Sequence, residues 1–446
     1  MSQAAQGPDE ITVEREFSLR TMPEIADHCL IPQPEGWPDD SDRFPIVPLT
    51  VMLEVMADAA LSLRPGRVVV AYEQVRALRW LPVEPPTRTL VRAVSEGPAA
   101  AGPGGAPGRG DRVRVTIEGY ATGQVVLADR YPAPPAPDKA PLAGERPAPV
   151  PARELYARGW MFHGPRFAGL ESIDAVADDG LKGRIRALPT RGALLDNAGQ
   201  LIGHWMQVSH TIDREILPTG FRAIRLYGPE QAGAVLGCTV RIREVTGTAM
   251  RADAELRTSD GRVWCQVEGW AVRRFVSNDA MWRTRLNPGA CLLAWAAPGG
   301  WTVAVERWPD TASREMIMRR YLNAAERAEY QRISPREQRL WLLGRIAVKD
   351  AVRRELWERG AGPVYPVEVA VAEAAGGGVC VRGSFQAPPV SVARSALGAP
   401  GRPVAVAVTG RARAPFSVSL DADGGVIVTE PAGTTRLPPP PEPAND

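Results

Sequence analysis

The sequence predicts an α+β fold in which an antiparallel sheet wraps around a central helix, twice, followed by a smaller α+β region. In the first copy, residues 49–63 carry apolar side chains at helical spacing and precede strands of alternating polarity. The same order recurs from residue 196 onward, and Glu-Gly-Tyr-Ala at 118–121 is echoed by Glu-Gly-Trp-Ala at 268–271. Such a sheet buries one face on its helix and leaves the alternating polar face in water.

The first half is expected to span residues 1–131. After the helix, its predicted strands cover residues 67–72, 89–95 and 112–120, the last alternating as Arg-Val-Arg-Val-Thr-Ile-Glu. Residues 97–110 are rich in Gly, Ala and Pro, which predicts a mobile hairpin tip. The Pro/Ala stretch 132–151 is predicted to be a linker with polyproline character.

The second half is expected to span residues 152–280, with a helix over 196–210. Its predicted strands cover 234–245, 250–257 and 263–274, and Asp260-Gly261 is predicted to form a hairpin turn. A third domain is expected over residues 291–431. The Pro-rich residues 432–446 are expected to be a disordered tail.

Composition excludes several function classes. A formal net charge of +2 in 446 residues gives no global field for nucleic acid or an anionic membrane, and the positive charge is mostly arginine, with only three lysines. The five cysteines lack disulfide or zinc spacing. The first residues are unlike a signal peptide, and no apolar run approaches the roughly 18 residues that span a bilayer. These features predict a cytoplasmic protein with reduced thiols, no membrane segment and no nucleic-acid partner.

The chain has four histidines, and two of them lie near an acid on the second predicted helix. Asp196, Gln200 and His204 share one helix face at spacings of four residues, and His210 ends that helix. An aspartate in this position can be a helix cap. It can also be a buried acid whose pKa is raised by desolvation, with Gln200 fixing its orientation.

Four stretches in this order resemble the polyketide-synthase dehydratases. Tyr-Ala-Arg-Gly-Trp-Met-Phe-His-Gly-Pro-Arg-Phe-Ala-Gly-Leu at 156–170 is similar to the motif that opens the second half of that family. Leu-Asp-Asn-Ala-Gly-Gln at 195–200 resembles its Asp-x-x-x-Gln motif, and Leu-Pro-Thr-Gly-Phe at 217–221 its Leu-Pro-x-x-Phe element. His28 and the run Val-Pro-Leu-Thr-Val-Met-Leu-Glu at 47–54 match the catalytic histidine and the proline-led helix start.

The resemblance implies a double hot-dog fold and an elimination of water from a 3-hydroxyacyl thioester. His28 would remove the α proton, and Asp196, kept protonated by an apolar tunnel, would donate to the departing β hydroxyl. The helix N-terminus would polarise the thioester carbonyl. The residues expected to bind substrate are Gln200, His163, Gly164, Pro48 and Pro218. The product would be a trans-2-enoyl thioester, formed without a cofactor while the substrate is carried on the phosphopantetheine of a carrier protein.

Two departures from the family pattern concern this site. Pro32 stands four residues after His28, where glycine is usual, and a polar insert, residues 33–43, separates His28 from Pro48. His163 stands where tyrosine is usual. The first departure bears on the substrate entrance, and the second on how the hydroxyl or thioester is held.

The third domain resembles a single copy of the short holo-acyl-carrier-protein-synthase type of phosphopantetheinyl transferase. Ser-Pro-Arg-Glu at 334–337 predicts a helix start with a capping box, and Leu-Gly-Arg-Ile-Ala-Val-Lys-Asp-Ala at 343–351 is similar to the family's signature helix. Lys349 and Arg394 are the candidate CoA or phosphate ligands, and Glu306 and Asp350 the possible Mg²⁺ ligands. Ala304 stands in place of the metal-binding aspartate, so we expect a degenerate transferase domain that could dock a carrier protein.

Other functions are compatible with the same residues. The His28–Asp196 pair could serve a product-template-like cyclase or an isomerase. The chain could be an active phosphopantetheinyl transferase with the first two halves as a carrier-protein docking surface, or a silent scaffold. The partners implied by the resemblance are an acyl carrier protein and a polyketide synthase, as in antibiotic biosynthesis, and a second copy of the chain in a homodimer.

Overall fold

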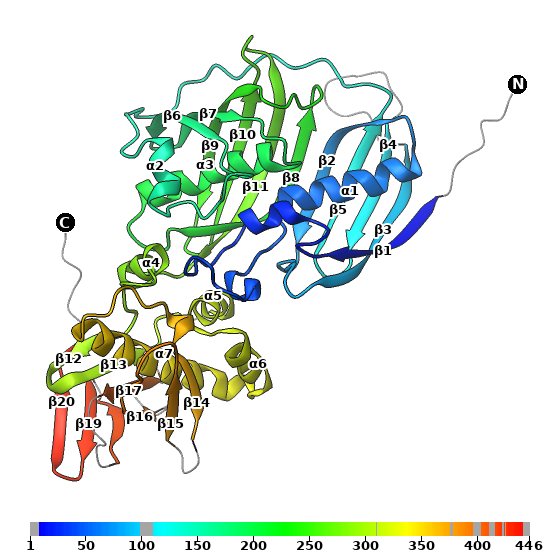
Figure 1. Ribbon diagram of the computed structural model, residues 1–446. Helices are drawn as coiled ribbons and strands as arrows, with labels where there is room; N and C mark the ends of the chain where they lie inside the picture. Colours follow the sequence, from blue (N-terminus) through cyan, green and yellow to red (C-terminus); the bar gives the residue numbers. More distant parts are fainter. Residues whose placement is uncertain are drawn as a thin grey trace, which may run out of the picture. The chain divides into compact units, whose positions relative to one another are not determined.

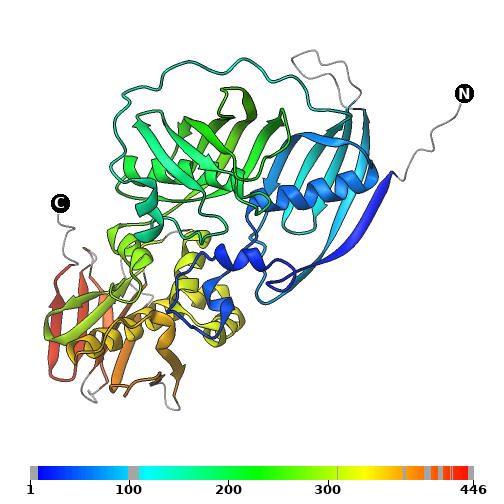
Figure 2. The same ribbon diagram turned by 45° about the horizontal axis from the view of Figure 1, so that its top comes forward.

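The computed structural model describes residues 9–98, 110–308, 310–374, 378–395, 403–409, 415–421, 423 and 425–439. The chain forms two compact units (Figures 1 and 2). Unit 1 contains Met1–Leu30 and Phe44–Phe275, and unit 2 contains Ile31–Arg43 and Val276–Asp446. The expected hairpin tip at 97–110 lies largely outside the described residues. Within the described part of the chain, every helix is too short or too polar to span a bilayer.

Unit 1 is built on one antiparallel sheet, which has eleven strands among the described residues. Their order is β1-β3-β4-β5-β2-β8-β11-β10-β9-β7-β6. The strands of the first half are β1 (Glu10–Phe17), β2 (Val68–Ala77), β3 (Thr87–Pro98), β4 (Asp111–Ile117) and β5 (Ala121–Ala128). Those of the second half are β6 (Leu170–Ala177), β7 (Gly180–Arg186), β8 (Glu215–Leu226), β9 (Val235–Val245), β10 (Ala249–Arg257) and β11 (Val263–Phe275).

Each half of the sheet packs on its own helix. The long helices are α1 (Leu49–Leu63) in the first half and α3 (Ala193–Ser209) in the second, with the short α2 (Ala152–Ala157) beside β6. Figure 1 shows α1 against β2–β5 and α3 against the strands around β9. The duplicated helix-and-sheet arrangement predicted from periodicity is therefore present.

The two predicted sheets are one continuous sheet, which corrects the expectation of separate ones. Strand β2 pairs with β8, with Tyr72 opposite Ile224, and so joins the halves. Strands β6, β7 and β8 were not predicted from the sequence. In β8, Pro218 lacks the N–H that a ladder uses, and the pairing with β11 shifts register next to it. Alternation of side chains gives a strand's faces but not its partner.

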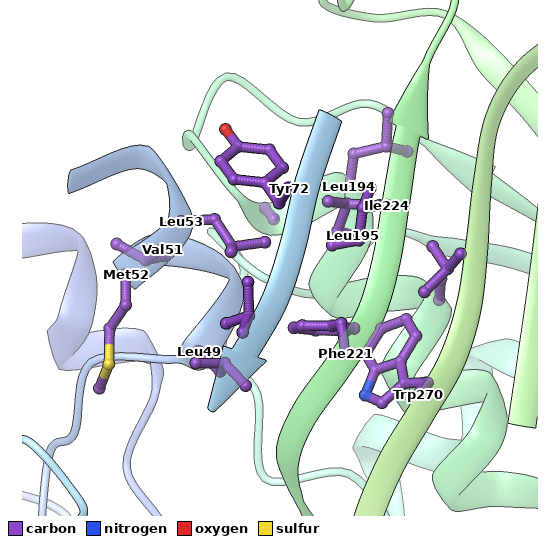
Figure 3. Close-up of a cluster of buried hydrophobic side chains, with 14 of the residues drawn as sticks. Leu49, Val51, Met52, Leu53, Tyr72, Leu194, Leu195, Phe221, Ile224 and Trp270 are labelled. Carbon is purple, nitrogen blue, oxygen red and sulfur yellow. The ribbon is translucent and has the colours of Figure 1, made fainter. Parts of the chain in front are cut away.

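Large apolar side chains fill the space between the helices and the joined sheet (Figure 3). Side chains from α1, α3, β2, β8 and β11 meet there, among them Leu53, Leu194, Phe221 and Trp270. A Cβ at Gly199 would lie 2.9 Å from the Trp270 ring, so glycine is needed for α3 to approach β11. Each such buried side chain contributes about 1.5–3 kcal/mol to folding. This core fixes α1 and α3 as rigid supports for the residues at their N-terminal ends.

Unit 2 is a small α+β body. Its main sheet has the order β12-β13-β17-β16, and the long helix α7 packs on β13, β16 and β17. Its helices are α4 (Asp279–Leu286), α5 (Thr311–Tyr321), α6 (Ala324–Arg332) and α7 (Pro335–Glu358). Its strands are β12 (Trp295–Ala297), β13 (Trp301–Val305), β14 (Ala370–Glu373), β15 (Val379–Arg382), β16 (Val390–Ser395), β17 (Val404–Thr409), β18 (Ser417–Leu420), β19 (Val426–Glu430) and β20 (Gly433–Leu437). Strand β20 pairs with β19, so residues 433–437 are part of a sheet and not of the disordered tail that was predicted to begin at residue 432.

The polar insert after His28 belongs to unit 2 rather than to the first half, which corrects the boundary 1–131. Asp42 is only 2% exposed and accepts hydrogen bonds from Trp37 Nε1 at 2.8 Å and from Arg327 Nη1 at 2.5 Å. Arg327 also donates to Ser41 at 2.8 Å. A buried ion pair between residues so far apart in the sequence has no local sequence signal.

Candidate active site

Three segments of unit 1 bring His28, His163 and Asp196 together. His28 follows the short 3-10 helix Pro23–Asp27, ahead of α1, and Asp196 lies in the first turn of α3. His163 lies between α2 and β6, and an antiparallel bridge pairs it with His28. A ring nitrogen of each histidine and a carboxylate oxygen of Asp196 all lie within 4.8 Å of one another. The predicted meeting of His28 and Asp196 from opposite halves is thus present in the geometry.

His28 is held in one tautomer when it is neutral. Its ring is 4% exposed, and Nδ1 lies 2.8 Å from the carbonyl oxygen of Ile46. A carbonyl only accepts, so Nδ1 carries the proton and Nε2 keeps its lone pair. Phe162 and Phe167 pack against the ring, with centroids 5.0 and 5.4 Å away. Burial lowers the pKa of His28 to about 4, so the ring is neutral at pH 7.

Asp196 is fixed by two neighbours. Its Oδ2 accepts a hydrogen bond from Gln200 Nε2 at 2.9 Å and lies 3.2 Å from His163 Nε2. The side chain is 12% exposed, and the first turn of α3 favours an anion there. Gln200 is in turn held by the Tyr156 hydroxyl, which donates to its Oε1 at 2.7 Å, and by the carbonyl of Phe167 at 2.8 Å.

The charge state of Asp196 differs from the expectation. Burial raises its pKa, but attraction to His163 and His28 and the hydrogen bonds from His163 and Gln200 outweigh burial, and the pKa ends below its usual value. Asp196 is therefore ionised in the substrate-free site and not kept protonated by apolar surroundings.

The other residues predicted to bind substrate have structural roles in this geometry. A Cβ at Gly164 would lie 2.8 Å from the carboxyl carbon of Asp27, so only glycine permits the close approach of the His163 loop. Pro48 is the N-cap of α1, and its carbonyl accepts from the first turn of that helix. Pro218 lies in β8, opposite Val272.

Sequence reasoning missed several residues around the site. The hydroxyl of Tyr156 and the amide of Asn197 connect α2, α3 and the start of β6: Asn197 accepts from Gly169 N at 2.8 Å. Tyr156 and Asn197 lie within the sequence motifs described above, but their positions in the sequence do not indicate that they contact the site. His204, which the sequence already places on the Asp196 face of the helix, is fully buried, and within the described structure neither of its ring nitrogens has a hydrogen-bond partner. Burial lowers the pKa of His204 to about 4.

In unit 2, the residues predicted to bind CoA or Mg²⁺ are engaged in separate internal contacts. Lys349 is fully buried, and its ammonium donates to Glu326 at 2.5 Å and to the carbonyls of Tyr321 and Pro366. Its three donors are therefore used inside the fold.

The two candidate Mg²⁺ ligands also have partners. Asp350 is fully buried and accepts from Arg353, Tyr321 and two backbone N–H groups, and Glu306 pairs with Arg339. Arg394 lies 3.4 Å from Glu373. These contacts do not form a shared phosphate or metal site. In this structure the four residues therefore make internal ion pairs, and their binding of CoA or Mg²⁺ stays a prediction.

A model of a known protein family matches one part of the chain, mostly in the second half of unit 1. Residues 134–281 match the family model "Polyketide synthase dehydratase N-terminal domain". The matched region contains His163, Asp196 and Gln200, whereas His28 and almost all of unit 2 lie outside it. The match supports a dehydratase-type hot-dog region in this part of the chain. No curated protein matches the chain.

Solved dehydratase structures are among those similar to the chain. The dehydratase domain of a mycocerosic acid synthase-like polyketide synthase is 21% identical, with 60% of this chain and 93% of that chain covered and a TM-score of 0.43. The dehydratase domain from the CurF module of curacin polyketide synthase is 18% identical, with 61% and 96% covered and a TM-score of 0.43. GphF dehydratase 1 is 16% identical, with 60% and 94% covered and a TM-score of 0.44.

Proposed function

We propose that the chain is a dehydratase that converts carrier-protein-bound 3-hydroxyacyl thioesters into 2-enoyl thioesters in polyketide or specialised fatty-acid synthesis. The observation that carries the proposal is the buried approach, within 4.8 Å, of His28 from the first half and Asp196 from the second. His28 lies in the first half and Asp196 in the second, so only the two halves together place both groups at one site. The family match over residues 134–281 supports the substrate class.

His28, His163 and Asp196 can together carry every proton that the elimination of water moves. The thioester acidifies the α carbon, and the neutral His28 takes the α proton on Nε2. The electron pair of the broken C–H bond forms the Cα–Cβ double bond. The β hydroxyl leaves as water with a proton that the Asp196–His163 pair takes up from solvent before the acyl chain enters. The proton on His28 then returns to that pair. No cofactor enters this balance.

The low pKa of His28 and the ionised Asp196 describe the substrate-free site. Entry of an acyl chain would remove remaining water and raise the free energy of separated charges. The proton shared by Asp196 and His163 would then be easier to transfer to a hydroxyl. Gln200 and Tyr156 would keep the carboxylate oriented toward the β carbon during this step.

The proposed partners are an acyl carrier protein and a polyketide synthase. A homodimer and a cytoplasmic location stay predictions from the resemblance. For unit 2 we propose a structural or carrier-docking role, because Lys349 and Asp350 are committed to internal contacts.

The proposal is tested by incubating a 3-hydroxyacyl-carrier protein with the full chain and measuring its intact mass. Wild type should remove one water, and His28→Ala and Asp196→Asn should not. His210→Ala, which changes a histidine at the end of α3, is the matched control and should retain the activity. Equal water loss with all four proteins, or none with wild type, would remove the assignment.

A further inference from the structure

The site combines two imidazoles and a carboxylate, a donor set that suits a transition metal as well as an elimination. We propose that His28, His163 and Asp196 bind a divalent transition metal, zinc above all, and that the bound metal blocks the dehydration. The second part of this proposal rests on the proposed function, and the first part stands without it. The three donors come from separate segments and meet within 4.8 Å in a buried setting.

The chemistry of the donors fits zinc. Zinc in open sites takes three protein ligands of the His and Asp/Glu type, with a fourth position for water. Zinc–ligand distances of about 2.0–2.2 Å place neighbouring donors of a tetrahedral site roughly 3.3 Å apart. His163 Nε2 and Asp196 Oδ2 already lie 3.2 Å apart. The remaining ligand atoms need to approach by no more than roughly 1.5 Å, which small rotations about side-chain bonds supply.

Two of the three ligands are oriented as metal ligands usually are. A ligating histidine typically donates its other N–H to a carbonyl or carboxylate, and the ligating carboxylate is itself hydrogen-bonded. His28 Nδ1 lies 2.8 Å from the Ile46 carbonyl, which leaves Nε2 for the metal. Asp196 Oδ2 accepts from Gln200 at 2.9 Å. These contacts preorganise the site before any metal arrives.

His163 is the residue that makes the donor set possible in this chain. The resemblance in sequence places tyrosine at this position in related dehydratases, and a neutral phenol is a poor zinc ligand compared with imidazole. Here the ring of His163 is stacked on Phe162 with centroids 4.0 Å apart, and its Nε2 faces Asp196. A metal bound by all three residues would occupy the lone pair of the proposed base and the carboxylate of the proposed acid. Elimination would then stop.

Metal binding is tested on the untagged full chain without substrate. Cobalt(II) alone should give the intense visible absorption of a tetrahedral site at one equivalent per chain, and Zn²⁺ should displace it. Affinity for Zn²⁺, measured by competition with a chromophoric chelator, should fall by about 100-fold or more in His163→Tyr and Asp196→Asn, because each removes a ligand and even the loss of an outer-shell partner costs about 10–100-fold. His210→Ala should bind as wild type does. Absence of the cobalt spectrum, or undiminished affinity in both ligand variants, would overturn the site.

The inhibitory part has a separate readout. Water elimination is measured with a chelator present and again after Zn²⁺ is added in slight excess. Activity in the chelator and its loss with Zn²⁺ would support the proposal, and full activity of the zinc-loaded protein would overturn the blocking role. Failure of wild type to eliminate water in the chelator would contradict the proposed function, while the cobalt result would still decide the metal site.

Discussion

Protonation of His204 should destabilise unit 1 over a defined pH range. His204 lies on α3 with its side chain fully buried, and its pKa is lowered from 6.5 to about 4 because burial penalises the charged ring. The unfolded chain therefore binds more protons than the folded chain between these two values. The free energy of unfolding is therefore unaffected by protonation of His204 above pH 6.5, and it decreases as the pH falls from 6.5 toward 4. At about 1.4 kcal/mol for each pKa unit, the loss amounts to about 3 kcal/mol.

The assay is urea unfolding of wild type and His204→Gln at several pH values, followed by tryptophan fluorescence. Glutamine has no titration in this range, so the difference in unfolding free energy between the two proteins isolates the histidine. We expect wild type to lose about 3 kcal/mol more than the variant between pH 7 and pH 4. His210→Gln serves as the control and should show a smaller difference, because His210 is less buried. Parallel pH profiles for wild type and His204→Gln would refute the reasoning.

Three further substitutions test other parts of the structure. Gln200→Leu removes the amide that donates to Asp196, and we expect the rate of water elimination to fall about 10- to 100-fold, since a hydrogen bond to a charged group is worth about 1.5–3 kcal/mol; an unchanged rate would contradict the orienting role. Lys349→Met leaves the buried carboxylate of Glu326 without its ion pair and should destabilise unit 2 by about 3–5 kcal/mol in urea unfolding. In a separate assay, wild type should transfer no phosphopantetheine from CoA to an apo-carrier protein. Transfer by wild type would restore the transferase hypothesis. Asp42→Asn leaves Arg327 buried without its ion pair and should cost about 3 kcal/mol in urea unfolding, whereas the exposed Asp40→Asn should cost little.

The sequence was informative wherever a local period determines structure. The apolar spacing over 49–63 and the predicted turn at Asp260-Gly261 correspond to α1 and to the hairpin between β10 and β11. The pairing of His28 with Asp196 could be predicted only through the resemblance, because no periodicity relates groups that far apart. The structure brings the two residues together, with Asp196 in the first turn of α3 and His28 at the end of the 3-10 helix Pro23–Asp27, and their catalytic roles stay predictions.

The features that the sequence did not reveal depend on distant partners. The joining of β2 to β8 requires knowledge of strand pairing, and Pro218 conceals β8. The insert 31–43 belongs to unit 2 because Asp42 meets Arg327. The pKa of Asp196 is lowered by His163, His28 and Gln200 together, which come from different parts of the chain and jointly outweigh burial. The role of a charged side chain therefore depends on the groups that it contacts in the folded chain.

The central claim is that His28 and Asp196 act as one unit on one substrate. A double-mutant cycle tests this most directly, with kcat/KM for water elimination measured for wild type, His28→Ala, Asp196→Asn and the double variant. Residues that act together are strongly non-additive, so the double variant should be no slower than the slower single variant. If the two losses instead multiply, the groups act independently and the account is contradicted.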